Sequence, residues 1–251
     1  MRTIKLTVAY DGTGFVGWQR QASGTSIQGL IEDALARIDG GAVTLHGAGR
    51  TDAGVHATGQ VASARIGCPH DEATLLRALN AHLPPAVRVC DVCVMSDDFH
   101  ARFSATAKTY EYRIWNGPIV PPALRLYVWH VPQPLDLPSL QQGADTIPGQ
   151  HDFAAFQGKG ATPRSTVRRV RSAEWRQAAD GSLVFEIRGG GFLRHMVRRL
   201  VGTLVEIGHR RRDPMDLERR FADRDRSLTG RTAPPEGLFL IKVEYDTRRA
   251  S

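Results

Sequence analysis

Cysteine is scarce in this sequence: Cys68, Cys90 and Cys93 are the only three. A small, odd number of cysteines argues against a disulfide framework. Cys90 and Cys93 match the spacing C-x-x-C, but they lie in a β-branched run, and strand residues three apart point to opposite faces. No second pair of Cys or His completes a zinc site. We therefore interpret the cysteines as structural.

Long apolar runs are also absent, and none approaches the roughly 20 residues that a membrane-spanning helix needs. Residues 1–10 alternate polar and apolar side chains, which is typical of a strand and not of a signal peptide with an apolar core. These two features predict a cytoplasmic protein. Its length of 251 residues is enough for one large domain or two small ones.

Acidic residues are the minority charge, with 26 Asp and Glu against 33 Lys and Arg, for a net charge of +7. A basic balance favours a polyanionic partner, although evenly scattered charge would give the same composition. Arginine clusters decide between these readings, because they gather in the C-terminal half. They comprise Arg168, Arg169, Arg194, Arg198, Arg199, Arg210, Arg211, Arg212, Arg219 and Arg220. Arginine suits planar contacts with phosphates and bases, so a nucleic acid is the expected partner.

Hydrophobic periodicity predicts an α+β fold. In the first half it indicates strands at 4–10, 42–46, 60–66 and 87–95, a helix over 27–38, and a second helix between Asp71 and Pro84. The order β-α-β-β-α-β is the ferredoxin-like arrangement. The second half repeats it loosely, with strands at 109–115, 167–175, 183–188 and 238–245 and helices at 135–147, 192–207 and 215–221. We expect two ferredoxin-like halves, 1–105 and 106–251, with a central antiparallel or mixed sheet. A ligand site is expected in the cleft between them.

The loop between the strands predicted at 42–46 and 60–66 is dense in polar and charged side chains. Residues 49–57 read Gly-Arg-Thr-Asp-Ala-Gly-Val-His-Ala, so a cation, a hydroxyl, a carboxylate and an imidazole lie within one turn-rich segment. The spacing matches neither a Walker loop nor a dinucleotide fingerprint. The residues alone leave open a plain turn in which Asp52 bonds its own backbone.

With Gly59-Gln60-Val61 after it, this segment resembles the signature of the TruA-type tRNA pseudouridine synthases. Further blocks resemble that family in the same order along nearly the whole chain. They are residues 11–19, 79–84, 98–105, 108–112, 151–153 with Phe156, 192–198 and 236–240. Residues 157–165 and 210–231 match no pattern that we can assign.

The resemblance implies a pseudouridine-synthase fold and an isomerase that converts uridine to pseudouridine at positions 38–40 in the anticodon stem-loop of tRNA. It also implies a homodimer in which one tRNA contacts both subunits, and a reaction with no metal and no cofactor. In that reaction uracil leaves its ribose and rejoins through carbon. The resemblance assigns the catalytic carboxylate to Asp52, as a nucleophile on the sugar carbon or as a base for a neighbouring proton, and the sequence does not choose.

The resemblance also assigns substrate contacts. Tyr110 would pack against the target base, and its hydroxyl would help to remove a proton; Arg198 would pair with Asp52 and favour its ionised form. Arg194, four residues earlier on the same predicted helix face, would contact a phosphate. Arg50 would help to extrude the target nucleotide, at a cost of roughly a few kcal/mol.

Other residues receive smaller roles. His56 is expected to make a structural hydrogen bond, His100 and Arg102 to hold the loop or the RNA, and Arg199 to lie at the surface. Two other functions remain open at this stage. One is a non-catalytic RNA-binding module. The other is a hydrolytic glycosidase, which usually needs a second carboxylate beside Asp52.

Overall fold

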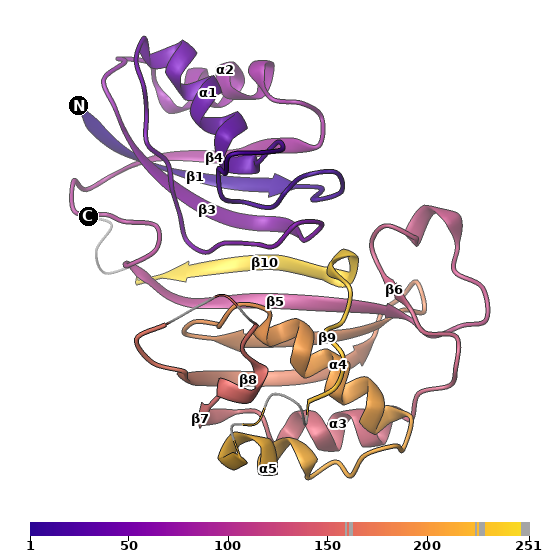
Figure 1. Cartoon of the computed structure of the whole chain (residues 1–251). Helices are drawn as coiled ribbons and strands as arrows, with labels where there is room; N and C mark the ends of the chain where they lie inside the picture. Colours follow the sequence, from indigo (N-terminus) through magenta and orange to yellow (C-terminus); the bar gives the residue numbers. More distant parts are fainter. Residues whose placement is uncertain (159, 161–162, 224, 226–228, 247–251) are drawn as a thin grey trace. The chain divides into compact units, whose positions relative to one another are not determined.

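The computed structural model describes residues 1–158, 160, 163–223, 225 and 229–246. It is a mixed α+β structure that divides into two compact units (Figure 1). The first unit holds residues 1–106 and the described residues from 239 onward, and the second unit holds residues 107–238. The strands of each unit form both parallel and antiparallel pairs, and we describe each unit by itself.

The first unit contains five strands and two helices among its described residues. They are β1 (Arg2–Tyr10), α1 (Ile27–Asp39), β2 (His46–Gly47), β3 (His56–Ile66), α2 (Glu72–His82), β4 (Val87–Met95) and β10 (Leu238–Tyr245). Its strands run in the order β4-β1-β3-β10, with the short β2 also paired to β3. Strand β1 is antiparallel to both of its neighbours, and β10 is parallel to β3.

Local sequence explains these elements. Alternate residues of β1, namely Ile4, Leu6 and Val8, are fully buried, as period-two patterning requires. Helix α1 begins where the Ser26 hydroxyl accepts a hydrogen bond from the Gly29 amide, and it ends at Gly40 in the left-handed conformation. At the end of β1, the Tyr10 hydroxyl is hydrogen-bonded to Thr51 in the loop that precedes β3.

The second unit contains most of the predicted second half. Its elements are β5 (Ala105–Trp115), β6 (Trp129–His130), α3 (Leu137–Asp145), β7 (Gly149–Asp152), β8 (Val167–Gln177), β9 (Leu183–Gly189), α4 (Met196–Gly208) and α5 (Asp216–Asp223). The antiparallel strands run in the order β5-β9-β8-β7, and β6 pairs parallel to β5. Helices α3 and α4 pack together, and α3 also contacts β8 (Figure 1).

Several predicted boundaries differ from the structure. The helix predicted over 192–207 begins only at Met196, because His195 has a left-handed backbone with φ of 60°. The prediction that Arg194 and Arg198 share a helix face is therefore wrong. Strand β10 was placed in the second half, but it lies in the first unit because it pairs with β3. Strand β3 starts at His56, four residues earlier than expected.

Cys68, Cys90 and Cys93 are all free thiols. Burial raises the pKa of the Cys93 thiol, and the hydrogen bond with Asp91 raises it further.

Within the described residues, no helix combines the length and apolar character needed to cross a membrane.

Candidate active site

Asp52 lies in the loop that joins β2 to β3 in the first unit. The Val55 amide donates to the Asp52 carbonyl at 3.2 Å, and Gly54 has φ of 77°, so residues 52–55 form a tight turn. The Asp52 side chain is half-buried, whereas Arg50 is exposed. The loop therefore presents a carboxylate and a guanidinium from one short segment.

A buried polar cluster of Tyr10, Thr51 and Gln60 holds this loop through hydrogen bonds. The Tyr10 hydroxyl and the Thr51 hydroxyl are hydrogen-bonded at 2.8 Å, and the Gln60 side-chain amide donates to the Gly49 carbonyl at 2.9 Å. Burial raises the pKa of Tyr10 to about 12, and the hydrogen bonds to Thr51 and Gln60 oppose that shift. Tyr10 consequently stays neutral at physiological pH and holds Thr51, the neighbour of Asp52.

The backbone of residues 11–18 packs against the backbone of the same loop. The Trp18 amide donates to the Thr51 carbonyl at 3.1 Å. Gly17 has φ of 100°, and a Cβ atom on it would lie 2.6 Å from the Thr51 carbonyl oxygen. A Cβ atom on Gly12 would lie 2.1 Å from the Val55 carbonyl oxygen. Both positions need glycine because two backbone segments touch there.

His56 ties three segments of the first unit together. Its Nδ1 accepts a hydrogen bond from the Gly12 amide at 3.0 Å and lies 3.2 Å from an Asp11 carboxylate oxygen. Its ring stacks on Phe239 of β10, with 4.7 Å between ring centroids. These contacts support the structural role expected for His56. They also place Asp11, which the sequence left without a position.

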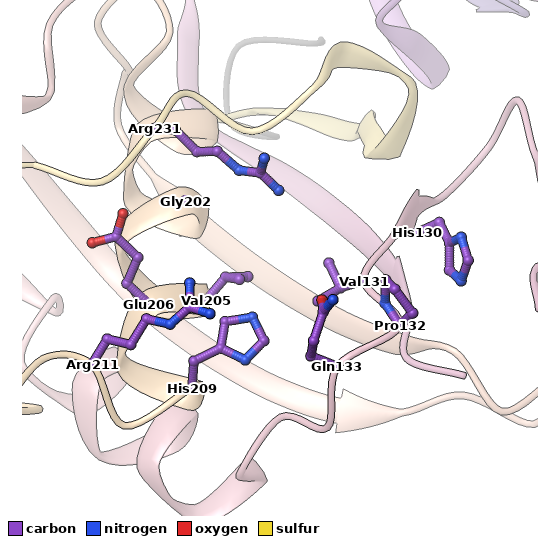
Figure 2. Close-up of a pocket in the computed structure, with 10 residues that line it drawn as sticks. All are labelled: His130, Val131, Pro132, Gln133, Gly202, Val205, Glu206, His209, Arg211 and Arg231. Atoms are coloured by element: carbon purple, nitrogen blue, oxygen red, sulfur yellow. The ribbon is translucent and has the colours of Figure 1, made fainter. Parts of the chain in front are cut away.

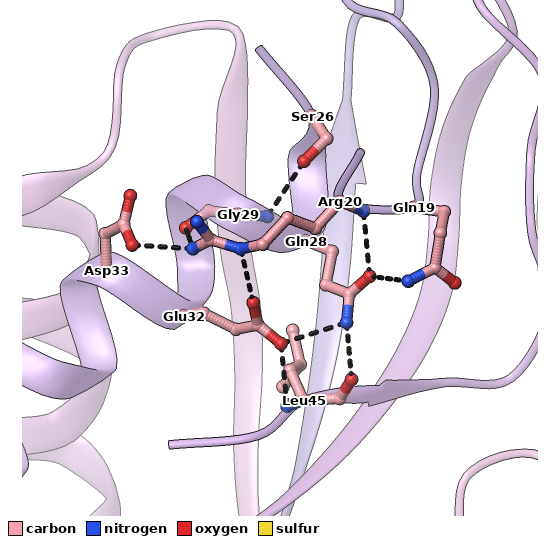
Figure 3. A network of polar contacts seen from close by, with 8 residues as sticks. All are labelled: Gln19, Arg20, Ser26, Gln28, Gly29, Glu32, Asp33 and Leu45. Carbon is pink, nitrogen blue, oxygen red and sulfur yellow. Dashed lines mark hydrogen bonds and ion pairs between the residues drawn. The ribbon is translucent and has the colours of Figure 1, made fainter. Parts of the chain in front are cut away.

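Arg50 is oriented by a network that reaches helix α1. Its Nε donates to the Gln19 side-chain oxygen at 2.9 Å, and the Gln19 amide donates to Gln28 at 2.6 Å. Gln28 in turn donates to Glu32 and to the Leu45 carbonyl, at 2.9 and 3.0 Å (Figure 3). The network thus connects the exposed Arg50 to the start of α1 and to the residue before β2.

His100 contacts the entry to the Asp52 loop. Its ring stacks on His46 of β2 at 4.9 Å, and its Nδ1 accepts from the Arg102 amide at 3.1 Å. Burial and the nearby His46 lower the pKa of His100. The stacking contact supports the expectation that His100 helps to hold the loop.

Two tyrosines of β5 have different surroundings in the second unit. Tyr112 is fully buried, its hydroxyl donates to the Pro234 carbonyl at 2.7 Å, and burial raises its pKa. Tyr110 retains a small exposed fraction of 7% and meets the edge of Phe192, with ring centroids 5.2 Å apart. Tyr112 is thus committed to the fold. This difference is a physical reason to prefer Tyr110 over Tyr112 as the candidate substrate contact, and the sequence alone did not provide one.

The arginines around the start of α4 also differ. Arg198 is half-buried, and its Nε donates to the Ala233 carbonyl at 2.7 Å. Arg194 is exposed and precedes the helix. Arg199 was expected at the surface, but that expectation is wrong: it is half-buried and donates to the carbonyls of Ala155 and Gln157.

Asp52 and Arg50 therefore lie in the first unit, and Tyr110, Arg198 and Arg194 lie in the second. The pairing of Asp52 with Arg198 stays a prediction. The sequence missed the residues that support the loop, namely Tyr10, Gly17, Gln60 and Phe239. Of the two segments without an assigned pattern, residues 159, 161, 162, 224 and 226–228 lie outside the described part.

Comparisons with known proteins give a consistent result. A family model described as tRNA pseudouridine synthase matches residues 6–104 and 144–246. The tRNA pseudouridine synthase A of Syntrophotalea carbinolica is 44% identical over 245 residues, which covers 98% of this chain and 97% of that protein. That of Solidesulfovibrio magneticus is 45% identical over 254 residues, covering 98% and 92%. That of Rhodospirillum rubrum is 41% identical over 253 residues, covering 100% and 90%.

Proposed function

Since the chain belongs to the tRNA pseudouridine synthase family, its reaction is the isomerisation of a tRNA uridine to pseudouridine, and we propose that Asp52 is the catalytic carboxylate. One observation carries this assignment. Asp52 is a half-buried carboxylate on a tight turn whose neighbour Thr51 is fixed by Tyr10, and the turn is packed against the backbone at Gly12 and Gly17. Catalysis requires such positioning, because reacting groups must be held in a near-attack geometry.

The chemistry needs one carboxylate in the ionised form. The bond between uracil N1 and ribose C1′ breaks, C5 bonds to C1′, the proton on C5 leaves, and N1 gains a proton. Asp52 either attacks C1′ as the base departs or removes a neighbouring sugar proton. Both routes place the same oxygen atoms close to the ribose.

The same proposal includes the remaining substrate contacts. Tyr110 packs against the target base, and its hydroxyl assists removal of the C5 proton. Arg198 pairs with Asp52, and Arg194, which is exposed just before α4, contacts a phosphate. Arg50, exposed and held at Nε by Gln19, helps to extrude the target nucleotide.

The finer description of fold and assembly belongs to the same proposal. Both units are ferredoxin-like, and in the first unit the order β4-β1-β3, with the short β2 also paired to β3, supports this for one of them. The targets are uridines 38–40 of the anticodon stem-loop. The enzyme acts in the cytoplasm as a homodimer, in which a second basic surface accommodates the long anticodon arm. Sedimentation of an active protein as a strict monomer would contradict the homodimer.

The decisive experiment compares wild-type protein with Asp52→Ala and Asp52→Asn on unmodified tRNA. We expect both variants to bind tRNA within about a factor of ten of wild type, about 1.4 kcal/mol, and to form no pseudouridine. Mapping of wild-type product should place pseudouridine at positions 38–40. Modification that persists in both variants would refute the role of Asp52, and free uracil as the main product would indicate a glycosidase instead.

A further inference from the structure

A concave site lies in the second unit, along helix α4. It is a cavity of about 340 Å³ lined by residues 130–133, by the C-terminal half of α4 and by two arginines, Arg211 and Arg231 (Figure 2). None of the residues assigned above to the reaction lines it. We call it the α4 pocket.

The α4 pocket continues the helix face that carries Arg198. Gly202, Val205, Glu206 and His209 line the pocket, and they follow Arg198 at the spacing that places residues on one side of a helix. Glu206 lies eight positions after Arg198, which corresponds to roughly 12 Å along the helix axis. A strand of RNA whose target nucleotide lies at Arg198 can therefore reach the pocket with a neighbouring nucleotide.

The side chains that line the α4 pocket make it cationic. Arg211 and Arg231 contribute two exposed guanidinium groups. Glu206 is the acidic residue among the lining residues, and its carboxylate is ion-paired with Arg212. The last carbonyls of α4 already accept backbone hydrogen bonds from residues 209–211, so they do not oppose an anion with bare oxygen atoms.

The fold holds Arg231 at this place. A Cβ atom on Gly202 would lie 1.7 Å from the Arg231 carbonyl oxygen, and the Gly230 amide donates to the Thr203 hydroxyl at 3.0 Å. The Arg231 guanidinium lies over the Trp129 ring, 4.7 Å from its centroid. Residues 230–231 thus pack against α4 through Gly202 and Gly230. The Trp129 ring orients the Arg231 guanidinium before a ligand binds, which reduces the conformational entropy lost on binding.

We propose that the α4 pocket binds a backbone phosphodiester of the RNA substrate beside the target nucleotide. Two guanidinium groups match the geometry of phosphate oxygens. A second copy of this chain, which also carries a net charge of +7, is a poorer match for a cationic pocket than RNA is. The inference rests on the proposed function, because it takes the RNA to be aligned by the catalytic residues.

The test replaces single phosphates of an anticodon stem-loop RNA with uncharged methylphosphonates. Binding is measured for wild type, for the double variant Arg211→Gln/Arg231→Gln, and for Arg37→Gln/Arg77→Gln, which removes two exposed charges from α1 and α2. For the wild-type protein we expect that replacing either of one or two phosphates close to the target uridine weakens RNA binding about tenfold. The pocket variant should have lost that sensitivity, and the α1/α2 variant should keep it. The salt dependence of the pocket variant should also be less steep, by about one unit of slope per lost contact.

Equal sensitivity to every methylphosphonate in wild type and in the pocket variant would overturn the inference. Inorganic phosphate is titrated in parallel, and phosphate binding without any coupling to the RNA positions would overturn the RNA assignment in favour of a small-anion site. Urea unfolding of each variant checks that the fold is intact. Pseudouridine formation by wild type is scored separately, so a failure of the proposed function is distinguished from a failure of the pocket.

Discussion

Replacing Gly17 with alanine tests whether the segment 11–18 positions Asp52. The new Cβ atom would lie 2.6 Å from the Thr51 carbonyl oxygen and 3.0 Å from the Asp52 carbonyl carbon. Ordinary contacts begin at 3.4 Å, so the backbone on either side has to move by about 0.8 Å. The atoms that meet are all backbone atoms, so no side chain can rotate away to relieve the contact.

Gly14 provides a matched control for the backbone strain. It also has a positive φ, of 81°, but a Cβ atom there would meet nothing within 4 Å. Gly14→Ala and Gly17→Ala should therefore share the cost of a left-handed residue, about 1–2 kcal/mol of unfolding free energy. Only Gly17→Ala should move the Asp52 loop. A displacement near 1 Å in a catalytic group lowers the rate about 100-fold.

The assay is single-turnover pseudouridine formation with enzyme in excess over tRNA, together with urea unfolding of both variants. We expect Gly17→Ala to be about 100-fold slower than Gly14→Ala, with tRNA affinity similar in the two. If the two variants react within about threefold of each other, the contact between Gly17 and Thr51 does not position Asp52, and the reasoning from the backbone contact fails.

Three further predictions concern other described contacts. Tyr10→Phe removes the partner of the buried Thr51 hydroxyl and should lower the unfolding free energy by about 1–3 kcal/mol. The pKa of Tyr10 is about 12 in the folded protein against an ordinary 10, so the folded protein binds the proton more tightly than the unfolded protein does. Between pH 10 and 12 the wild-type protein should therefore lose about 1.4 kcal/mol of unfolding free energy per pH unit through Tyr10. Tyr10→Phe should lack that slope in alkaline urea titrations. Gly202→Ala drives a Cβ atom to 1.7 Å from the Arg231 carbonyl and should cost about 1–3 kcal/mol in urea unfolding; an unchanged midpoint would show that this segment adjusts freely. Tyr110→Phe should slow pseudouridine formation about 100-fold, whereas Tyr112→Phe should lose about 1 kcal/mol of stability with a rate within about threefold of wild type; the reverse pattern would exchange their roles.

Local patterning was sufficient to predict most of the helices and strands. The alternation in β1 and the 3.6-residue spacing in α1 reflect burial on one face, which needs no knowledge of the partner element. The start of α4 was missed because His195 adopts a left-handed conformation that its neighbours do not signal. The place of β10 was missed because strand pairing is a long-range property.

The candidate site was only partly visible in the sequence. Asp52 stood out because its loop concentrates glycine and polar side chains. The residues that hold it did not, since Tyr10 reads as one more apolar position in a strand and Phe239 is 183 residues from the ring on which it stacks. Gly17 is informative only when the chain that touches it is known. Packing partners of this kind need tertiary structure.

The pairing of β10 with β3 has a consequence for how the protein is made. Phe239 stacks on His56, directly after the Asp52 turn, yet it is synthesised only after the entire second unit. While translation proceeds from the N-terminus, the first unit lacks this strand, and the ring face of His56 lacks its cover. Closing that pair also spans the longest loop between paired strands of the first unit, and long-range pairings of this kind generally form more slowly than local ones. An incompletely translated chain therefore carries the Asp52 segment without the contact between Phe239 and His56, and this part of the first unit is completed last.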